Sequence, residues 1–237
     1  MARILILRDA SASKLTARLV KAMGDTALVL PTQEIRPLGP ELPQGPFGGL
    51  IVTSVNAVPF LSSRFPVARP PVLAVGPATA HAVRKAGAGP VILGKGTGTG
   101  LAERSLALFE ASGLPLLYLA GRIRTEGLET ALATHGVPFE TLDVYDTVPL
   151  DPDPETIAAV LGEGGTDAVL LLSVGQAESF LRLLSTSPGR FDPPPIALCL
   201  SDRIAATLPP SLRDGALVAN RPELSDLLRH YRETRAI

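Results

Sequence analysis

Short, uninterrupted apolar runs recur along the chain, and segments with helical periodicity separate them. The runs cover residues 3–8, 27–30, 49–53, 72–75, 91–93, 116–119, 139–144, 167–172, 196–200 and 216–219. Runs without polar alternation are typical of strands buried on both faces, as in a parallel sheet covered by helices. Their alternation with helices predicts repeated βαβ units and therefore an α/β fold.

The two halves of this series resemble copies of one another. Matching residues follow in the same order: Leu15 and Leu128, Leu19 and Leu132, Gly24 and Gly136, Ser54 and Ser173. An ordered set of matches indicates an internal duplication. A chain of 237 residues is also long enough for two domains of about 110 residues each. We therefore predict two similar three-layer α/β/α domains with parallel sheets.

Two extended segments, 26–38 and 139–150, are long for ordinary strands, and each ends in a Pro-Leu pair. We interpret them as a two-stranded connector that crosses between the domains. The predicted domains are then a continuous one over 40–143 and a discontinuous one made of 1–36 and 147–237.

Charge and cysteine content restrict the classes of function. The net charge of −1 argues against a general nucleic-acid binder, which usually carries a basic surplus. Cys199, the only cysteine, lies in an apolar run, so we expect a packing residue in a reducing compartment. No apolar stretch approaches the ~18 residues of a membrane helix, and no histidine has a metal-ligand partner at the usual spacing. We expect a cytoplasmic protein with no metal, membrane or nucleic-acid partner.

Polar residues follow several of the predicted strands. Ser54 and Asn56 come directly after the run 49–53, and Ser173 repeats the turn after the run 167–172. These side chains suit helix caps, but the free backbone N–H groups of a helix start also bind carboxylates. Gly76 permits close backbone approach, and Thr79 is expected to face outward from a second anion-binding helix start. Two roles remain open for these residues: helix capping alone, and helix capping together with ligand binding.

The glycine-rich stretch 94–100 follows a strand and precedes a helical pattern, which is the context of a phosphate cradle. It lacks the residue order of a P-loop and the spacing of a dinucleotide fingerprint. A nucleotide site, a plain loop and a wall of a binding cleft all remain open.

The turn Thr-Ser-x-Asn-Ala-Val at 53–58, followed by Ala-Val-Gly-x-x-Thr-Ala at 74–80, resembles uroporphyrinogen-III synthases. So do the glycine- and leucine-bearing helix entry at 121–132 and Val-Tyr-Asp-Thr-Val-Pro at 144–149, and the resemblance covers about 3–220. It implies two lobes with five-stranded parallel sheets, joined by a two-stranded connector, with the N-terminal segment in the C-terminal lobe. It also implies cofactor-free closure of hydroxymethylbilane, a linear tetrapyrrole, with loss of water and inversion of the last ring through a spiro intermediate.

The resemblance implies roles for individual residues. Tyr145 matches the family's cleft-facing tyrosine and is the expected proton donor to the leaving hydroxyl. Thr79 is expected to bind substrate, as are Gly76, Ser54, Asn56 and Ser173 at strand ends.

Two arginines, Arg8 and Arg122, are expected either to pair with propionates or to form surface ion pairs. The second copy of the Gly-x-x-Thr-Ala motif has lost its threonine, so Ser201 or Arg203 is expected to substitute. We expect a monomer, and transient contact with the preceding pathway enzyme stays open. Two other functions also stay open: a two-lobed cytosolic small-molecule-binding protein, and a nucleotide-dependent transferase that uses 94–100.

Overall fold

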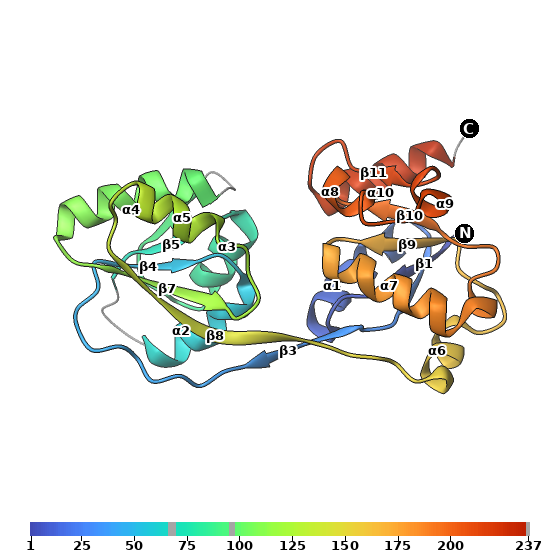
Figure 1. Cartoon of the computed structure of the whole chain (residues 1–237), viewed down its shortest axis with the longest axis horizontal. Helices are drawn as coiled ribbons and strands as arrows, with labels where there is room; N and C mark the ends of the chain where they lie inside the picture. Colours follow the sequence, from blue (N-terminus) through green and yellow to red (C-terminus); the bar gives the residue numbers. More distant parts are fainter. Residues whose placement is uncertain (66–69, 95–97, 236–237) are drawn as a thin grey trace. The chain divides into compact units, whose positions relative to one another are not determined.

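The computed structural model describes residues 1–65, 70–94 and 98–235. Residues 95–97 of the glycine-rich stretch, on which the nucleotide-site hypothesis depends, lie outside the described residues. The chain forms two compact units, which we call unit 1 (Met1–Glu34 with Pro149–Ile237) and unit 2 (Ile35–Val148). Figure 1 labels most of the helices and strands of both units.

Unit 1 contains a five-stranded parallel sheet in the order β11-β10-β9-β1-β2. Its strands are β1 (Arg3–Ile6), β2 (Thr26–Val29), β9 (Ala168–Leu171), β10 (Ile196–Cys199) and β11 (Leu217–Val218). In the centre, Ile4 lies opposite Ala27 on one side and Ala168 on the other. Strands predicted from separate parts of the chain therefore form one sheet.

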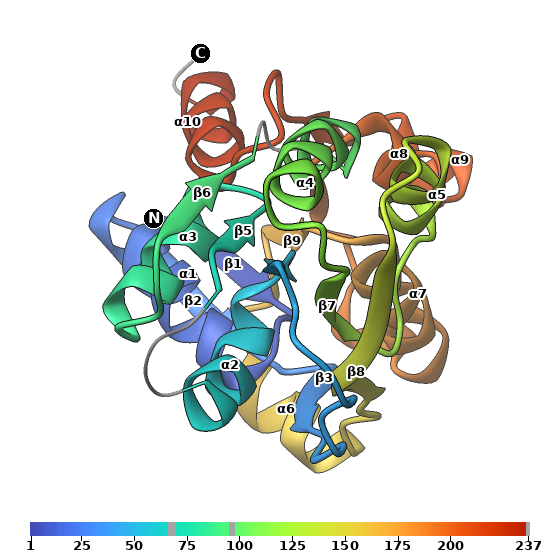
Figure 2. The same cartoon turned by 90° about the vertical axis from the view of Figure 1, so that its left-hand side faces the viewer.

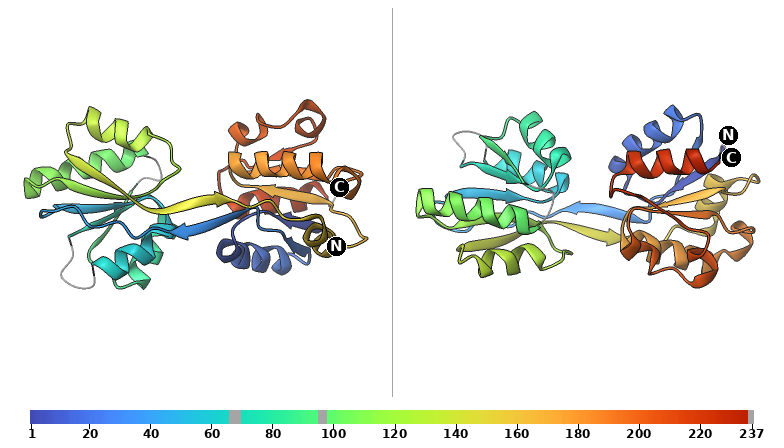
Figure 3. Two further views of the ribbon diagram at one scale, coloured as in Figure 1. Left: turned by 60° about the horizontal axis from the view of Figure 1, so that its bottom comes forward. Right: turned by 90° about the horizontal axis from the view of Figure 1, so that it is seen from above.

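Helices cover both faces of this sheet because β1 is apolar in both directions. Ile4 and Ile6 pack with α1 (Ala10–Ala22) and α10 (Leu224–Thr234). Leu5 and Leu7 pack on the opposite side, where the helices are α6 (Pro154–Leu161), α7 (Val174–Thr186), α8 (Asp202–Ala205) and α9 (Pro210–Arg213). Figure 3 shows these layers from two directions. The continuous apolar run predicted this arrangement.

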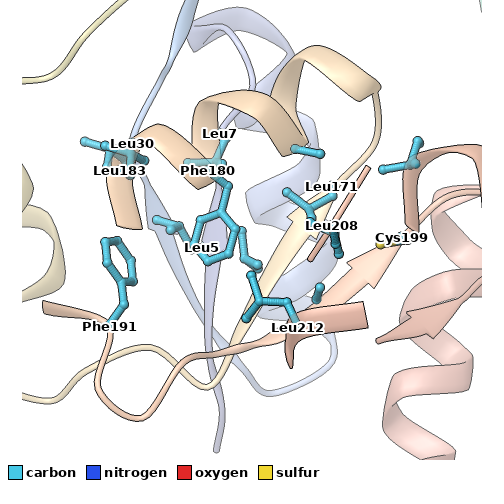
Figure 4. Packing of buried hydrophobic residues seen from close by; sticks show 14 of the residues in the cluster. Leu5, Leu7, Leu30, Leu171, Phe180, Leu183, Phe191, Cys199, Leu208 and Leu212 are labelled. Atoms are coloured by element: carbon cyan, nitrogen blue, oxygen red, sulfur yellow. The ribbon is translucent and has the colours of Figure 1, made fainter. Parts of the chain in front are cut away.

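Phe180 of α7 lies at the centre of the core that contains Leu5 and Leu7 (Figure 4). Its ring meets Phe191, which follows the short helix η2 (Pro188–Arg190), at a centroid distance of 5.6 Å and an interplanar angle of 88°. Edge-to-face packing of this kind is favourable for aromatic pairs. The predicted packing role of Cys199 is confirmed, because its side chain is buried in the same cluster.

The buried thiol should be inert in the folded protein. Burial raises the pKa of Cys199 to about 11, and the thiolate is the reactive form. We expect an aromatic disulfide reagent at about pH 8 to label Cys199 only after unfolding. Since the ordinary pKa is 9.0, the unfolded chain loses this proton first, and stability should decrease as pH rises from about 9 to about 11. Rapid labelling of the native protein would contradict this burial.

Unit 2 contains most of a six-stranded sheet in the order β3-β8-β7-β4-β5-β6. Its strands are β3 (Gln33–Pro37), β4 (Gly49–Val52), β5 (Val72–Ala74), β6 (Val91–Leu93), β7 (Leu116–Gly121) and β8 (Phe139–Pro149). Leu50 and Val52 pack with η1 (Val55–Ala57), α2 (Val58–Arg64) and α3 (Pro77–Lys85). Ile51 faces the other way, toward α4 (Gly98–Ser112) and α5 (Gly127–Thr134).

Five of these strands, β8, β7, β4, β5 and β6, run parallel as expected, and β3 joins the edge beside β8 as the second strand of the predicted two-stranded connector (Figure 2). Hydrogen bonds from Leu38 N to Val144 O and from Leu150 N to Thr32 O make this pair antiparallel. The predicted single segment over 26–38 is also divided, since Thr32 donates both its N–H and its hydroxyl to Leu7 O. Pro31, which has no N–H, precedes this break.

The predicted match of Leu15 and Leu19 with buried leucines of α5 is off by one residue. In α1, Thr16 and Val20 occupy the buried positions, and both leucines are exposed. A glycine with positive φ follows each of the two helices, and after α1 it is Gly24. Counting back the same number of residues from each glycine aligns the buried positions of the two helices. A shift of one residue turns a side chain by about 100° around a helix.

Candidate functional site

The parallel strands bring most of the predicted site residues to the carboxyl edges of the two sheets, where open α/β sheets bind ligands. In unit 1, Arg8, Ser173 and Ser201 follow β1, β9 and β10. In unit 2, the residues that follow β4, β5 and β7 are Ser54 with Asn56, Gly76 with Thr79, and Arg122.

Arg8 is a half-buried cation at the edge of unit 1. Its Nη1 donates to Thr16 Oγ1 over 3.1 Å. Burial lowers the pKa of the Arg8 guanidinium, and the neighbouring carboxylate of Asp9 opposes this effect. A guanidinium stays protonated in proteins even so. Arg8 therefore presents a positive charge held by a neutral partner, which suits an incoming carboxylate.

The two serines of this edge, Ser173 and Ser201, stand at the N-cap positions of helices. Ser173 Oγ accepts the N–H of Gln176 over 3.3 Å and starts α7. Ser201 precedes the four-residue helix α8 and makes no side-chain cap bond. A serine hydroxyl that accepts a cap bond still has its own proton to donate. Ser173 therefore caps its helix through its side chain, and the hydroxyl protons of both serines remain available to a ligand.

The same turn recurs in unit 2. Ser54 Oγ accepts the N–H of Asn56 over 3.2 Å, at the start of η1. Asn56 is half-buried and lines a hollow of about 250 Å³ that also includes Phe60, Arg64 and Val144. The amide side chain therefore borders an accessible space inside unit 2.

Gly76 and Thr79 open α3, but they differ from the expectation. Gly76 is the N-cap, with no side-chain cap bond, and a Cβ placed on it would meet nothing within 4 Å. The approach to the first turn of α3 is therefore open. The expected outward orientation of Thr79 is wrong, because its relative exposure is 5%. Thr79 is the third residue of α3 and lies on the buried side of that helix with Ala80 and Val83.

Tyr145 is positioned by a β-bulge. Ala120 pairs with Asp143 and Gly121 with Tyr145, so Val144 is the extra residue on β8. Val144 and Tyr145 consequently pack on the same core, although consecutive strand residues normally face opposite ways. The bulge redirects Tyr145 at the carboxyl end of β7.

The ring of Tyr145 lies directly over Gly121. A Cβ at position 121 would be 2.6 Å from Tyr145 Cζ and 2.7 Å from its Oη. Contacts of that length do not occur between ordinary side chains, so only glycine fits under the ring. The position of the Tyr145 ring therefore depends on the bulge and on the lack of a side chain at Gly121.

Arg122 forms the surface ion pair that the sequence left open. Its Nη1 lies 3.0 Å from Asp146 Oδ2, and 57% of the arginine side chain is exposed. Exposed pairs of this kind contribute about 0–1 kcal/mol, so the pairing does not preclude a ligand. Arg122 N also donates to Tyr145 O over 2.9 Å and thereby joins the two strand ends.

The sequence interpretation missed a pocket at this edge. It has a volume of about 320 Å³ and is lined by Thr53, Val75, Tyr118, Arg124, Thr125, Gly127 and Leu128. The hydroxyls of Thr53 and Tyr118 are 3.0 Å apart. Burial raises the pKa of Tyr118, and the hydrogen bond with Thr53 opposes this rise. Both hydroxyls stay neutral near pH 7 and can donate hydrogen bonds.

Arg124 supplies the positive charge of this pocket. Its guanidinium contacts Gly121 O at 2.8 Å, Asp143 Oδ1 at 2.7 Å and Glu129 Oε1 at 2.9 Å. Burial alone would lower the pKa of Arg124, but the hydrogen bonds and charges of Glu129 and Asp143 raise it above its ordinary value. Among the described residues, Glu129 Oε2 is buried without a hydrogen-bond partner, so the cluster holds a polar group open for a donor.

Two signals in the sequence pointed to this pocket. Tyr118 is the only polar-tipped side chain in the run 116–119, and a buried tyrosine usually needs a hydrogen-bond partner. Arg124 stands two residues beyond Arg122 in the same strand-end turn. In the described part of the chain, no group of His, Cys, Asp and Glu side chains could hold a metal ion. Every helix described is too short or too polar to cross a membrane.

Comparison with known proteins agrees with this architecture. A family model for uroporphyrinogen-III synthase HemD matches residues 14–229. The crystal structure of uroporphyrinogen-III synthetase from Helicobacter pylori 26695 gives a TM-score of 0.68 at 20% identity, covering 99% of this chain and 100% of that one. A mutant uroporphyrinogen III synthase from the extremely thermophilic bacterium Thermus thermophilus gives 0.55 at 19% identity, covering 100% and 99%. The two structures share the fold, and because the family match extends across both units and all the strand-end motifs except Arg8, the chain belongs to the uroporphyrinogen-III synthase family.

Proposed function

We propose that Tyr145 gives a proton to the hydroxyl that leaves hydroxymethylbilane. The observation that carries this proposal is the bulge, which places the phenol over Gly121 at the carboxyl edge of the sheet. Bulges commonly redirect side chains next to active sites. A tyrosine whose ring occupies a space that no other residue could share is well fixed for proton transfer.

The enzyme closes hydroxymethylbilane into uroporphyrinogen III in haem biosynthesis, with inversion of the last ring and loss of water. Electrons of a pyrrole nitrogen expel the hydroxyl, which takes the proton of Tyr145 and departs as water. The last ring attacks through its substituted α-carbon to give the spiro intermediate, whose older bond to the chain then breaks, and the ring rejoins through its unsubstituted α-carbon. That carbon loses its proton when the ring regains aromaticity, and this proton restores the phenol. The balance is one water lost and no net change in the enzyme.

Binding is proposed to rest on the carboxylates of the substrate, because each pyrrole ring carries an acetate and a propionate. The uncapped first turn of α3 at Gly76 offers backbone N–H groups to one of them. The pocket beside Arg124 offers another carboxylate the hydroxyls of Thr53 and Tyr118, because Arg124 itself is already paired with Asp143 and Glu129. Such fixed contacts raise the rate by holding the chain curled for closure.

Further carboxylate contacts are proposed at Arg8, Ser54, Asn56, Arg122, Ser173 and Ser201. We also propose a cytoplasmic monomer that meets the preceding pathway enzyme only transiently. The single buried cysteine favours a reducing compartment, since a secreted domain more often carries disulfides.

The direct test is the isomer of the product. Purified full chain is mixed with hydroxymethylbilane, the products are oxidised to porphyrins, and the isomers are separated chromatographically. We expect the type III isomer to exceed type I, because closure without enzyme omits the ring inversion. A reaction without protein provides the control, and type I alone in both reactions would contradict the proposed function.

A further inference from the structure

Helix α1 presents leucines to solvent on the side away from its sheet. The relative exposure is 61% for Leu15 and 37% for Leu19, one turn apart on the same helix face. The buried side of α1 holds Ser13, Thr16 and Val20. Single exposed apolar residues are ordinary, whereas neighbouring ones that form a contiguous patch indicate an interaction surface.

A groove adjoins these leucines, between α1 and α10. It has a volume of about 280 Å³ and is lined by Leu19, Ala22, Met23, Ser225, Leu228, Arg229 and Arg232. Both helices lie on the same face of the sheet, side by side in the right-hand view of Figure 3. Leu19 therefore lines an apolar groove, and Leu15 lies one helical turn from it on the same helix face.

The rim of this groove is basic. Arg229 and Arg232 line the groove, and α1 carries three further exposed cations, Lys14, Arg18 and Lys21. The acidic residues of α10 and its cap are Glu223, Asp226 and Glu233, so the two helices carry 5 − 3 = 2 positive charges. Arg229 contacts the buried Asp226 and still keeps 57% of its side chain exposed. The charge differs in sign from the whole chain, whose net charge is −1.

We propose that this groove binds an acidic amphipathic helix of a partner protein. An apolar channel between two helices receives the leucines of a third helix, as in helix-in-groove recognition. Carboxylates beside those leucines would meet the arginines and lysines of the rim. A second copy of this chain would bring the same basic rim against itself, and like charges disfavour that pairing. A bilayer surface would leave the hollow around Met23 and Leu228 unfilled.

The test is a selection from a displayed library of helical peptides in which the positions beside a leucine stripe vary in charge. The bait is the full-length chain, with the double variant Leu15→Ser/Leu19→Ser as the counter-bait. We expect enrichment of peptides with Glu or Asp beside the leucines. Their affinity should decrease at least tenfold on the double leucine variant and on Arg18→Glu/Arg232→Glu, and it should weaken as salt is raised.

The matched control is Leu42→Ser, which removes another exposed leucine and should leave peptide affinity unchanged. All variants should keep the wild-type synthase rate and unfolding temperature, because none of these residues belongs to the reaction site. No enrichment, enrichment of neutral or basic peptides, or equal binding to the leucine variant would each overturn the proposal. So would leucine-dependent binding to phosphatidylglycerol vesicles without acidic peptides, or a leucine-dependent dimer in sedimentation.

Discussion

Replacing Tyr145 with phenylalanine is expected to lower kcat for type III formation by roughly 100-fold, since a positioned general acid contributes about 10²–10⁴. The ring of Tyr145 packs against the core of unit 2, so Tyr145→Phe removes the hydroxyl and keeps the packing. KM should change little because the proposed carboxylate contacts come from other residues. Steady-state kinetics with isomer analysis would measure both parameters.

The control for this substitution is Tyr231→Phe, which removes a hydroxyl from a buried tyrosine of α10. It should leave kcat unchanged, because α10 packs on a face of unit 1 and lies outside the strand ends. A Tyr145→Phe enzyme with native stability and an unaltered kcat would remove the acid role and leave this tyrosine as a packing residue.

Gly121→Val should impair the enzyme almost as strongly as loss of the phenol. A Cβ at this position would lie 2.6 Å from Tyr145 Cζ, so the ring must move by an ångström or more. Displacement of a catalytic group by about 1 Å costs roughly 100-fold in rate. We expect kcat to decrease by that factor, with circular dichroism and thermal unfolding used to verify that the protein is folded.

A double-mutant cycle separates displacement of Tyr145 from a general defect. If Gly121→Val acts through Tyr145, it should cost little further activity in a Tyr145→Phe background, because coupled residues are not additive. Gly189→Val is the matched control, since a Cβ there meets nothing within 4 Å and its kcat should be unchanged. Fully additive losses would show that the two residues act separately.

The strands could be predicted from the sequence because their burial on both faces is encoded locally. The run 91–93 coincides with β6, and the run 116–119 lies within β7. Nothing comparable marks the β-bulge at Val144, since a bulge depends on how two strands pair rather than on the residues of either. The exposure of Leu15 shows the same limit, because helix rotation is settled by packing that the sequence does not display.

The candidate site was predictable to the level of strand ends. Ser54 and Ser173 could be placed because short polar residues after a buried strand start helices. The pocket with Tyr118 and Arg124 could not be predicted, because it forms only where side chains from separate strand ends meet in space. The outward orientation expected of Thr79 was wrong for a related reason, because the side of α3 that is buried is settled by tertiary packing.

The pairing of β1 with β9 has a consequence for how the nascent chain acquires its structure. Ile4 cannot pair with Ala168 until that residue is made, and all of Ile35–Val148 is synthesised in between. Domains generally fold as units during synthesis, so the inserted segment can mature on the ribosome while β1 still lacks its partner β9. Ladders between such distant residues form slowly, and a chaperone that shields exposed apolar segments would act first on the amino-terminal residues.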